Sequence, residues 1–520
     1  MSLLLSCLLC LVAGCGSSSI VSSKIAPPVR TLTPGVVAGT ANPLVASYTI
    51  SPPSPASVSI QFGPDATYGF TTSSQEVSTS NTPVSIQVAG MKASSTYHMR
   101  AHITYDDGTT QDDADQTFTT GAIPAGIVPS FTVSTTTGLT PQPGVELVDV
   151  LPGATNGEPL VTDLAGNVIW YYAFPDYQQS DLLYPIKLLP NGHMMFLIAL
   201  PSQLPITTPT APGALNAIRE IDLAGNTIRQ LNMSDLNASM AAAGFNITLQ
   251  LFTHDFAALP NGHILVLANT LKTFNDLPGY PGATNVLGDV VVDLDPNFKP
   301  VWVWNEFDHF DVNRHPMNFP DWTHSNAVVY SPDDGSFLVS MRHQNWVVKV
   351  DYRNGAGSGA VLWKLGQGGD FKLQGGVDPT DWFYAQHDPT FVSKNTTGSF
   401  TLALMDNGDD RMFPPSVTCN GSGVPPCQYT TIPVMQIDEN AKTASLVFHD
   451  SVDFYSSFAG STRVLPNTNV EYNLAGVGDD AYTDEVTPTS NPQTVWEMHI
   501  SGSNTYRSFR MPSLYPGVQW

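Results

Sequence analysis

The sequence predicts an all-β protein, a six-bladed β-propeller preceded by a small β-sandwich of the immunoglobulin or fibronectin-III kind. Of the 520 residues, 41 are Gly and 42 are Pro, and only 13% are charged, a composition typical of chains built from strands and turns. Two short sequence units recur along the chain at intervals of about 60–85 residues, as a repeat architecture requires. Helix signals are scarce, and Ser234–Ala243 is the segment that looks helical.

Residues 1–26 predict a lipoprotein-type signal peptide and a tether. A short apolar run, too short to span a bilayer, ends in small residues before Cys15. This pattern resembles a bacterial lipoprotein signal, in which Cys15 would become the lipidated first residue. The Ser- and Pro-rich stretch that follows is typical of a flexible tether. We therefore expect an exported, periplasmic protein that is anchored by lipid to a bacterial membrane.

Residues 27–122 predict the fibronectin-III-like sandwich. Short alternating runs of β type suggest strands at Leu44–Ile50, Val58–Phe62, Val84–Val88, Tyr97–Tyr105 and Gln116–Thr119. The segment from Gly90 to Tyr97 resembles the turn into a tyrosine corner, where the hydroxyl of Tyr97 would bond back to the backbone. Because no convergent set of ionisable groups is found here, we expect a spacer or assembly domain.

Residues 123–520 carry the repeat and predict the propeller. One unit is a Leu-Pro-Asn-Gly turn followed by apolar residues, as at Leu189–Gly192 and Leu259–Gly262. The other is an apolar strand that closes on Asp, turns, and continues into a strand often bearing Trp, as from Asp163 to Trp170. Together they supply about four antiparallel strands, which make one propeller blade. The predicted blades are residues 145–172, 183–230, 252–304, 324–364, 387–448 and 461–520, with a seventh as an alternative if the termini hide another.

One hairpin suggests the chemistry of the propeller. Strands at His324–Tyr330 and Ser336–Arg342, joined by a Ser-Pro-Asp-Asp-Gly turn, would pair residues whose numbers sum to about 666 or 667. His324 then lies across from Arg342. A His and an Arg held side by side repel when both are protonated, but the pair suits an anion such as sulfate or phosphate.

Histidines recur at one register of neighbouring blades. His254 precedes the Leu of its turn by five residues, Tyr184 has that place one blade earlier, and His324 and His387 begin the next two blades. This strand should be the innermost of each blade, so three imidazoles and Arg342 would converge on the central channel. His343, which follows Arg342, should point to the other side.

Charge and motif content restrict the function. The formal net charge of −24 argues against nucleic-acid binding, and no Gly-rich phosphate loop is present for a nucleotide donor. Three His could bind zinc, as in a metal-dependent lyase or hydrolase, but a guanidinium beside a divalent cation is unfavourable, so we expect neither a metal nor another cofactor. The set fits transfer of a sulfuryl group, with one neutral His as nucleophile, a second as proton shuttle, and the Arg and third His stabilising the oxygens.

Four segments resemble the bacterial arylsulfate sulfotransferases: Thr253-His254-Asp255, the run from Asp321 to Ala327, Ser340 to Gln344, and Gln386-His387-Asp388. The resemblance covers most of residues 25–520. It implies a propeller enzyme, independent of nucleotide sulfate donors, that passes sulfuryl from an aryl sulfate ester to a phenol through a sulfohistidine.

The resemblance also implies roles for individual residues and an assembly. His387 would be sulfated, His254 would be the acid/base, and His324, Asn326 and Arg342 would bind sulfuryl. Tyr184 is a candidate aromatic contact for the substrate ring, and Arg507 and Arg510 are candidates for a C-terminal basic residue of the site. Homodimers and a single structural disulfide are further implications.

Two cysteines remain beyond the signal segment, Cys419 and Cys427, on either side of a Gly/Pro-rich loop. In an oxidising compartment this spacing predicts a disulfide. A non-enzymatic cell-surface binding propeller is the remaining functional alternative to the transferase and to the metal-dependent enzyme.

Overall fold

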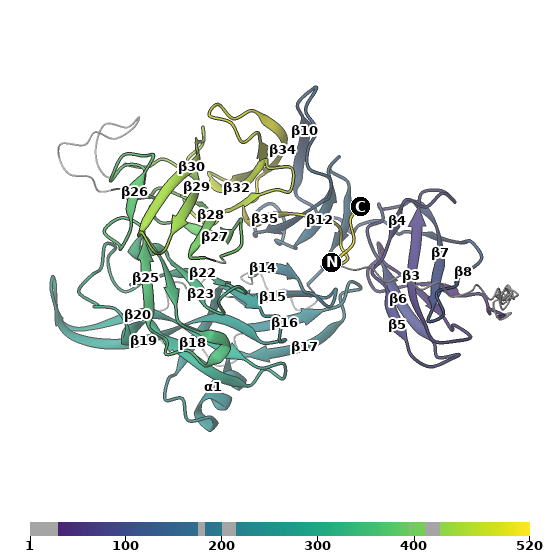
Figure 1. Ribbon diagram of the computed structural model, residues 1–520, viewed down its shortest axis with the longest axis horizontal. Helices are drawn as coiled ribbons and strands as arrows, with labels where there is room; N and C mark the ends of the chain where they lie inside the picture. Colours follow the sequence, from purple (N-terminus) through teal and green to yellow (C-terminus); the bar gives the residue numbers. More distant parts are fainter. Residues whose placement is uncertain (1–29, 175–181, 200–214, 396, 410, 412–426) are drawn as a thin grey trace, which may run out of the picture.

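The computed structural model describes residues 30–174, 182–199, 215–395, 397–409, 411 and 427–520. Strands dominate these residues, and the α-helix found among them, α1 (Met233–Ala242), lies where the sequence predicted one. Figure 1 shows a small β-sandwich beside a larger group of sheets arranged around a centre. The predicted all-β fold class is confirmed.

The N-terminal module consists of two antiparallel sheets. The smaller has the order β1-β2-β6, and β3 and β7 form the middle of the larger, with β4, β5, β8 and β9 at their edges. Alternate residues of β3 and β7 are buried, so one face of this sheet forms the core of the module. The strands are β1 (Val36–Gly39), β2 (Ala46–Ile50), β3 (Ala56–Gly63), β4 (Phe70–Thr71), β5 (Gln75–Val77), β6 (Val84–Val88), β7 (Thr96–Tyr105), β8 (Thr110–Asp112) and β9 (Gln116–Thr119).

The predicted tyrosine corner is present in this module. The backbone N–H of Lys92 donates to the hydroxyl of Tyr97 over 3.1 Å, and the ring of Tyr97 is buried. The bond fixes the turn that leads into β7 and so sets the angle at which that strand enters the sheet.

Six further sheets follow the module. Four of them, the second to the fifth, are formed from consecutive strands, as the repeat predicts, and the last of these four has a short extra strand, β26, at its edge. Their strands are β14 (Leu182–Leu188), β15 (Met194–Ala199), β16 (Ala217–Ile221) and β17 (Thr227–Asn232); β18 (Leu249–Ala258), β19 (Ile264–Leu277), β20 (Tyr280–Leu294) and β21 (Pro300–Asn305); β22 (Ser325–Tyr330), β23 (Phe337–Met341), β24 (Trp346–Val350) and β25 (Val361–Leu365); and β26 (Lys372–Gln374), β27 (His387–Phe391), β28 (Ser399–Met405), β29 (Thr431–Asp438) and β30 (Thr443–Ser451).

The two remaining sheets combine strands from both ends of the propeller sequence. The last strand, β35, pairs with β11, so it completes the first sheet and not the sixth. In return β10 pairs with β34 at the outer edge of the sixth sheet. The strands are β11 (Val145–Val150), β12 (Leu160–Asp163), β13 (Val168–Tyr171) and β35 (Thr505–Met511), and β10 (Ser130–Thr135), β31 (Ser461–Val464), β32 (Val470–Val477), β33 (Asp480–Val486) and β34 (Thr494–Ser501).

This exchange corrects two of the predicted blades. The range 461–520 is not one blade, because its final strand lies in the sheet of residues 145–171. The physical reason is that a first sheet of only three strands would leave its inner edge unpaired, and β35 supplies the missing ladder of backbone hydrogen bonds. Each sheet contacts the next, and the sixth contacts the first through β32 and β35, which is the arrangement of a propeller.

The interior strands are apolar on both faces because each sheet is packed between two others. Every residue of β15 and β24 is buried, while the outermost strand β17 is largely exposed or half-buried. The hairpin of β22 and β23 has the predicted register, with Tyr330 opposite Phe337, and slips by one residue near Ser325.

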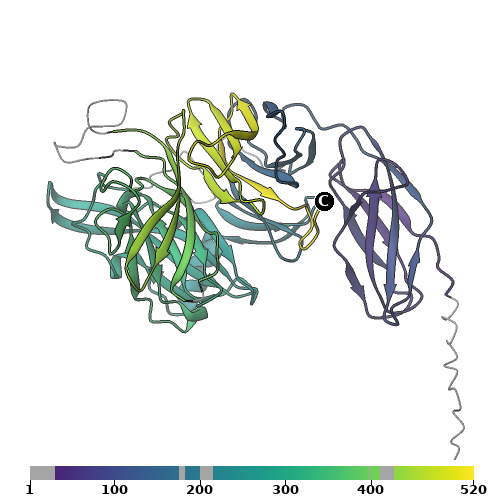
Figure 2. The same cartoon turned by 45° about the horizontal axis from the view of Figure 1, so that its top comes forward.

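The C-terminal residues join the module to the propeller, as the view in Figure 2 shows. The ring of Trp520 packs edge-on against Phe62 and Phe70 of the module. The hydroxyl of Tyr515 donates to the carbonyl of Gln87 (2.9 Å) and accepts from the N–H of Ala89 (2.7 Å).

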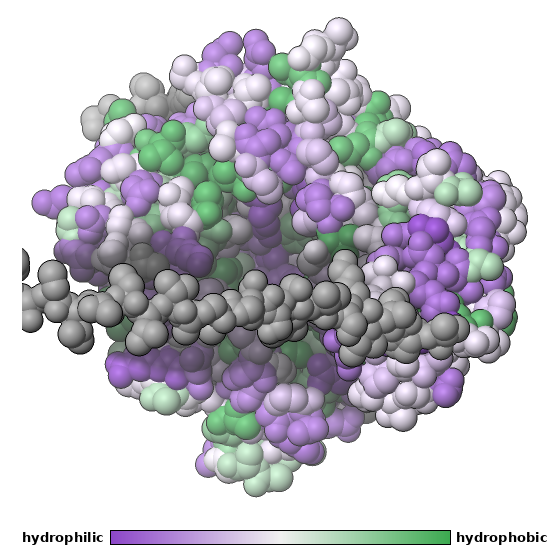
Figure 3. Space-filling model, turned by 45° about the vertical axis from the view of Figure 1, so that its right-hand side comes forward, coloured by the Kyte–Doolittle hydropathy of each residue, from purple (hydrophilic) through white to green (hydrophobic). Residues whose placement is uncertain are grey.

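Hydrophilic residues predominate on the face drawn in Figure 3, and hydrophobic ones form small separate patches. Among the residues that the structure describes, none belongs to a helix with the length and apolarity needed to cross a bilayer. Cys15 and the rest of the predicted signal lie outside the described residues.

Candidate functional site

The three predicted histidines lie where the innermost strands of neighbouring sheets are distorted. The pairing of β18 shifts between Phe252 and Phe256, that of β22 between Ser325 and Ala327, and that of β27 between His387 and Thr390. Such bulges bend a strand and redirect its side chains.

The backbone at these bulges is left-handed. His254 has φ of +55°, His324 +47°, and Asp388, next to His387, +49°. Non-glycine residues rarely adopt this conformation, which costs free energy and is concentrated at functional sites. Because the same unusual conformation occurs at this position in three consecutive sheets, it indicates a functional site there.

The structure brings the predicted histidines together. The ring centroids of His254 and His324 lie 4.5 Å apart, and Tyr184 lies 6.3 Å from His254. Desolvation is the largest cause that lowers the pKa of His254, His324 and His387, and the positive charge of Arg342 adds to it for each of the three rings. The side chain of His324 is 26% exposed and that of His387 is buried, so the cluster runs inward from the surface.

His387 is held in one tautomer by Asn407. The Nδ1 atom of His387 lies 2.6 Å from the Oδ1 atom of Asn407, and the amide nitrogen of Asn407 donates to the carbonyls of Ser456 (2.9 Å) and Ala459 (3.1 Å). The amide oxygen must therefore face the imidazole, and an amide oxygen can only accept. Nδ1 carries the proton, and Nε2 presents a lone pair.

Burial keeps this imidazole neutral. Desolvation, followed by the charge of Arg342, lowers the pKa of His387 well below its ordinary value, although the bond to Asn407 opposes this. Desolvation and the charge of Arg342 likewise lower the pKa of His324 to about 3. In the unliganded protein both rings are neutral at pH 7 and able to accept a proton or attack an electrophile.

His324 meets a carboxylate where His387 meets an amide. Its Nδ1 donates to Oδ2 of Asp321 over 2.5 Å, and its ring stacks on His343 at a centroid distance of 4.6 Å. His343 donates from Nδ1 to the Asp321 carbonyl (2.8 Å) and accepts from Arg342 at Nε2 (2.7 Å). The prediction that His343 points away from the site is wrong, because Arg342 and His343 lie in a short 3-10 turn, Arg342–Gln344, and not in an alternating strand.

Arg342 is fixed by several partners. One terminal nitrogen donates to His343 and the other to the Asp409 carboxylate and, over 3.4 Å, to the Ser457 carbonyl. The hydroxyl of Tyr455 donates to the other oxygen of Asp409. The guanidinium is thus held beside the histidines by groups from the fifth sheet and the segment that follows it.

The two C-terminal arginines have different places. Arg507 is fully buried beside the site: it donates to the carbonyl of Asn326 (2.9 Å) and lies 3.2 Å from the carboxylates of both Asp255 and Asp388. Arg510 is buried elsewhere, in a cluster of three glutamates at the junction of the first and sixth sheets. Of the two C-terminal candidates, Arg510 therefore does not lie with the predicted site residues.

The predicted substrate-binding residues Asn326 and Tyr184 lie close to the cluster. The amide nitrogen of Asn326 donates to the carbonyl of Gln386 (2.8 Å), while its Oδ1 has no hydrogen-bond partner among the described residues. The rings of Tyr184 and Tyr506 lie 4.3 Å apart, and Tyr506 donates to the backbone carbonyl of His254 over 3.1 Å. Together they supply an aromatic wall beside His254.

One group of side chains in the cluster has the spacing of metal ligands. Donor atoms of Asp321, His324 and His343 lie within 4.8 Å of one another. However, the Asp321 side chain and carbonyl accept from the Nδ1 atoms of the two imidazoles, and Arg342 lies 2.7 Å from the remaining nitrogen of His343. A guanidinium in this position repels a cation and attracts an anion.

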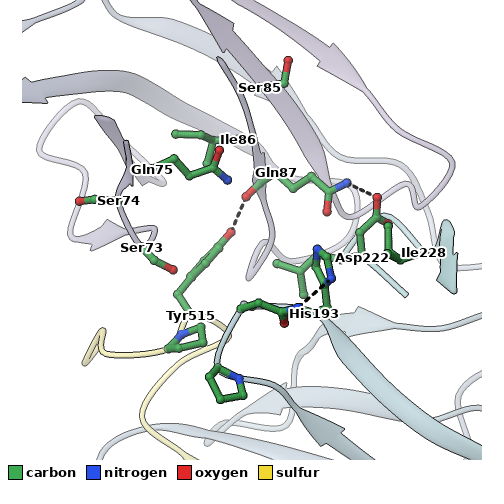
Figure 4. A pocket seen from close by; sticks show the side chains of 15 residues that line it. Ser73, Ser74, Gln75, Ser85, Ile86, Gln87, His193, Asp222, Ile228 and Tyr515 are labelled. Atoms are coloured by element: carbon green, nitrogen blue, oxygen red, sulfur yellow. Dashed lines mark hydrogen bonds between the residues drawn. The ribbon is translucent and has the colours of Figure 1, made fainter. Parts of the chain in front are cut away.

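A cavity of about 460 Å³ lies between the module and the second sheet, away from the histidine cluster. Gln75 and Gln87 of the module, His193 and Asp222 of the propeller and Tyr515 of the C-terminal tail line it (Figure 4). Neither Arg nor Lys is among the described residues of its lining, so it lacks the cations that a sulfate ester requires. This cavity is therefore not the site of the predicted chemistry.

Sequence reasoning missed the residues that hold the histidines. Asp321 could have been found, because it precedes His324 by three residues within the same motif. Asn407 gave no signal, since it lies 20 residues from His387 and belongs to no repeat. Cys419 lies outside the described residues, and Cys427 is fully buried, so their pairing stays a prediction.

A family model described as Arylsulfotransferase (ASST) matches residues 131–509. The search of curated proteins finds no match.

Three solved structures match this chain at low similarity. A duf4221 family member from Bacteroides vulgatus has 7% identity and a TM-score of 0.33, covering 74% of this chain and 98% of its own. Apocarotenoid oxygenase from Synechocystis has 10% identity and a TM-score of 0.28, with 92% and 94% covered. Hydrazine synthase from Kuenenia stuttgartiensis has 12% identity and a TM-score of 0.23, with 62% and 78% covered. Likenesses of this strength do not bear on function.

Proposed function

We propose, from the premise that this chain belongs to the arylsulfotransferase family, that it transfers a sulfuryl group from an aryl sulfate ester to a phenol through a sulfated His387. The observation that carries the proposal is the clustering of His254, His324 and His387 near the positive charge of Arg342, with the Nε2 lone pair of the buried His387 free to attack.

The first half-reaction begins at His387. Its Nε2 attacks the sulfur atom of the ester, a bond forms between nitrogen and sulfur, and the bond from sulfur to the aryl oxygen breaks. The leaving oxygen takes a proton from His254 and departs as a phenol. Burial holds the pKa of His254 well below its ordinary value in the unliganded protein, and the negative charge of a bound ester raises it towards the protonated form.

The second half-reaction reverses these steps with another phenol. The acceptor hydroxyl gives its proton to His254, its oxygen attacks sulfur, and the electron pair of the nitrogen–sulfur bond returns to Nε2 of His387. His254 is again protonated, so the cycle consumes no net proton and requires neither a nucleotide nor a metal.

The sulfuryl oxygens need positive charge and hydrogen-bond donors in the transition state. Arg342 supplies a fixed positive charge. The negative charge of the bound ester favours protonation of His324, which can then donate from Nε2 while Asp321 balances the added positive charge. Arg507, which donates to the backbone carbonyl of Asn326, adds positive charge near the site. The rings of Tyr184 and Tyr506 form the surface on which an aryl ring would pack.

The test is turnover of 4-nitrophenyl sulfate with phenol as acceptor, in the presence of a chelator. We expect wild-type protein to release nitrophenol and His387→Ala to lose activity by roughly 10³-fold or more, as is typical for a lost nucleophile. His102→Ala, in the N-terminal module, is the matched control and should retain wild-type turnover.

Two outcomes would contradict the proposal. One is the absence of turnover with a broad panel of acceptors, and the other is full activity in His387→Ala. Activity that disappears with the chelator and returns with zinc would support the metal-dependent alternative instead.

The proposal includes a setting for the enzyme. It places the protein outside the cytoplasm, tethered through Cys15, with a disulfide between Cys419 and Cys427 and with two copies forming a homodimer. Mass spectrometry of the processed protein and sedimentation of the purified one test these points.

A further inference from the structure

We infer that Asn407 is a positioning residue that keeps the Nδ1 proton on His387 through both half-reactions and thereby keeps the sulfated intermediate reactive. The inference rests on the proposed function and adds to it the control of the intermediate.

The geometry leaves Asn407 one way to act. The side-chain Nδ2 of Asn407 donates to two backbone carbonyls, those of Ser456 and Ala459. The backbone carbonyl of Asn407 accepts from Thr430 Oγ1 over 3.0 Å. Asn407 is fully buried and His387 is 3% exposed. Neither the amide nor the ring can turn over without breaking buried hydrogen bonds, each of which is costly to leave unmade.

The proton on Nδ1 decides how easily the sulfuryl group leaves. When Nε2 of a neutral imidazole attacks the ester, the ring keeps its Nδ1 proton and becomes positively charged, so the N-sulfoimidazolium intermediate is a zwitterion with its negative charge on the sulfonate oxygens. From this species the departing group is a neutral imidazole, which is a good leaving group. If Nδ1 loses its proton, the product is an N-sulfoimidazole anion with a neutral ring, whose departing group would be an imidazolide anion, and transfer to the phenol becomes slow.

An amide oxygen suits this requirement better than a carboxylate. Asn407 accepts the hydrogen bond but cannot take the proton, whereas an aspartate in its place would draw the proton away and stabilise the intermediate. The site contains both partners: His324, which must carry added positive charge but is not sulfated, meets the carboxylate of Asp321. The nucleophile and the oxyanion-binding histidine thus differ in the group at Nδ1.

The experiment compares wild type with Asn407→Asp, Asn407→Leu and the control Asn395→Asp. Asn395 is a buried asparagine in a turn of the same sheet, where its Oδ1 accepts from the N–H of Gly398. Rapid quenching after mixing with 4-nitrophenyl sulfate measures the nitrophenol burst and the adduct on His387. Addition of phenol then measures decay of the adduct.

We expect Asn407→Asp to form the adduct but to pass it to phenol at least about tenfold more slowly, so that it outlives the wild-type adduct. Asn407→Leu should slow the burst itself, because Nδ1 loses its acceptor and the ring is free to adopt the other tautomer. Histidine ¹⁵N spectra of the unliganded proteins should show the Nδ1–H tautomer at His387 in wild type and a mixture in Asn407→Leu. Asn395→Asp should resemble wild type in all three measurements.

The failures are distinguishable. A wild-type protein that turns over without an adduct on His387 removes the proposed function. An adduct of equal lifetime in wild type and Asn407→Asp overturns the inference alone. If Asn407→Asp does not fold, an unchanged burst and tautomer in Asn407→Leu overturns it.

Discussion

The three histidines of the site differ in the hydrogen-bond partner of their Nδ1 atoms. The Nδ1 of His387 faces an amide and that of His324 a carboxylate, while Nδ1 of His254 has no hydrogen-bond partner among the described residues. A free Nδ1 leaves the tautomer of His254 unconstrained, which suits a group that both gives and receives a proton. These three environments match the proposed roles of His387 as nucleophile, His324 as binder of the sulfuryl oxygens and His254 as the acid and base.

The neutrality of His324 predicts a pH dependence of stability. The folded pKa of about 3 lies below the ordinary unfolded value of about 6.5, so between these pH values the unfolded chain binds a proton that the folded protein does not. The contribution to stability is present above pH 6.5 and is lost as the pH falls towards 3, at up to about 1.4 kcal/mol per pH unit.

His324→Asn should remove this contribution while preserving a donor towards Asp321. We expect its unfolding free energy, measured by urea titration between pH 6.5 and 5, to fall less steeply with decreasing pH, by about 1 kcal/mol per unit. His102→Asn, in the module, should keep the wild-type slope. Equal slopes in His324→Asn and wild type would mean that His324 is already protonated in the folded state.

At the residue level the sequence predicted which side chains converge better than how they are held. His254, His324 and His387 were found because repeated turns place them at one register. The contact of His343 with the site could not be predicted, because it depends on where β23 ends and the 3-10 turn begins. Asn407 belongs to no pattern, since its role depends on two carbonyls from a distant loop.

The strands provide the precision of the site through their irregularities. A regular β18 or β22 would direct alternate side chains into the packing between sheets. The bulge of β18 includes His254, and His324 immediately precedes the bulge of β22, so neither residue is bound to that alternation. The sequence predicted the β22–β23 hairpin and its register because the turn residues fix both, but a bulge leaves no comparable signature.

The tyrosine corner permits a test at the level of one element. Tyr97→Phe removes the hydroxyl that accepts from the N–H of Lys92, and we expect the module to lose about 1 kcal/mol of stability. Hydrogen exchange of β7 amides in the full chain should quicken about fivefold, while the propeller strands stay unchanged. Tyr105→Phe, whose hydroxyl bonds to the side chain of Gln111, is the control with a smaller effect. Unchanged exchange in Tyr97→Phe would mean that the corner does not stabilise the module.

At the scale of the whole molecule, the first and sixth sheets meet at a buried charge cluster. Arg510 on β35 bonds to Glu146 of β11 (2.9 Å) and Glu485 of β33 (2.9 Å), and lies 3.4 Å from Glu471 of β32. Three carboxyl groups on one guanidinium leave an excess of negative charge. Burial and the neighbouring Glu146 raise the pKa of Glu471 well above its ordinary value, so that it holds a proton.

Replacing the arginine should weaken the junction. In Arg510→Met the buried carboxyl groups lose their cation, and we expect the free energy of unfolding to fall by about 3–5 kcal/mol. The loss should be greater at pH 8 than at pH 5, because carboxyl groups without a cation must be protonated to remain buried. Arg353→Met, which removes an arginine whose side chain is 69% exposed, should change stability by less than about 0.5 kcal/mol. A similar small change in Arg510→Met would show that the cluster does not hold the sheets together.

The placement of β35 has a consequence for the order of events during biosynthesis. The strand that completes the first sheet contains Tyr506 and Arg507 and is synthesised after every strand that carries a histidine of the cluster. A nascent chain can therefore contain every histidine of the cluster and still lack Arg507, which donates to the backbone carbonyl of Asn326. The proposed sulfuryl transfer should therefore become possible only after β35 has been synthesised and has paired with β11, and a chain cut before β35 should carry all three histidines and transfer nothing.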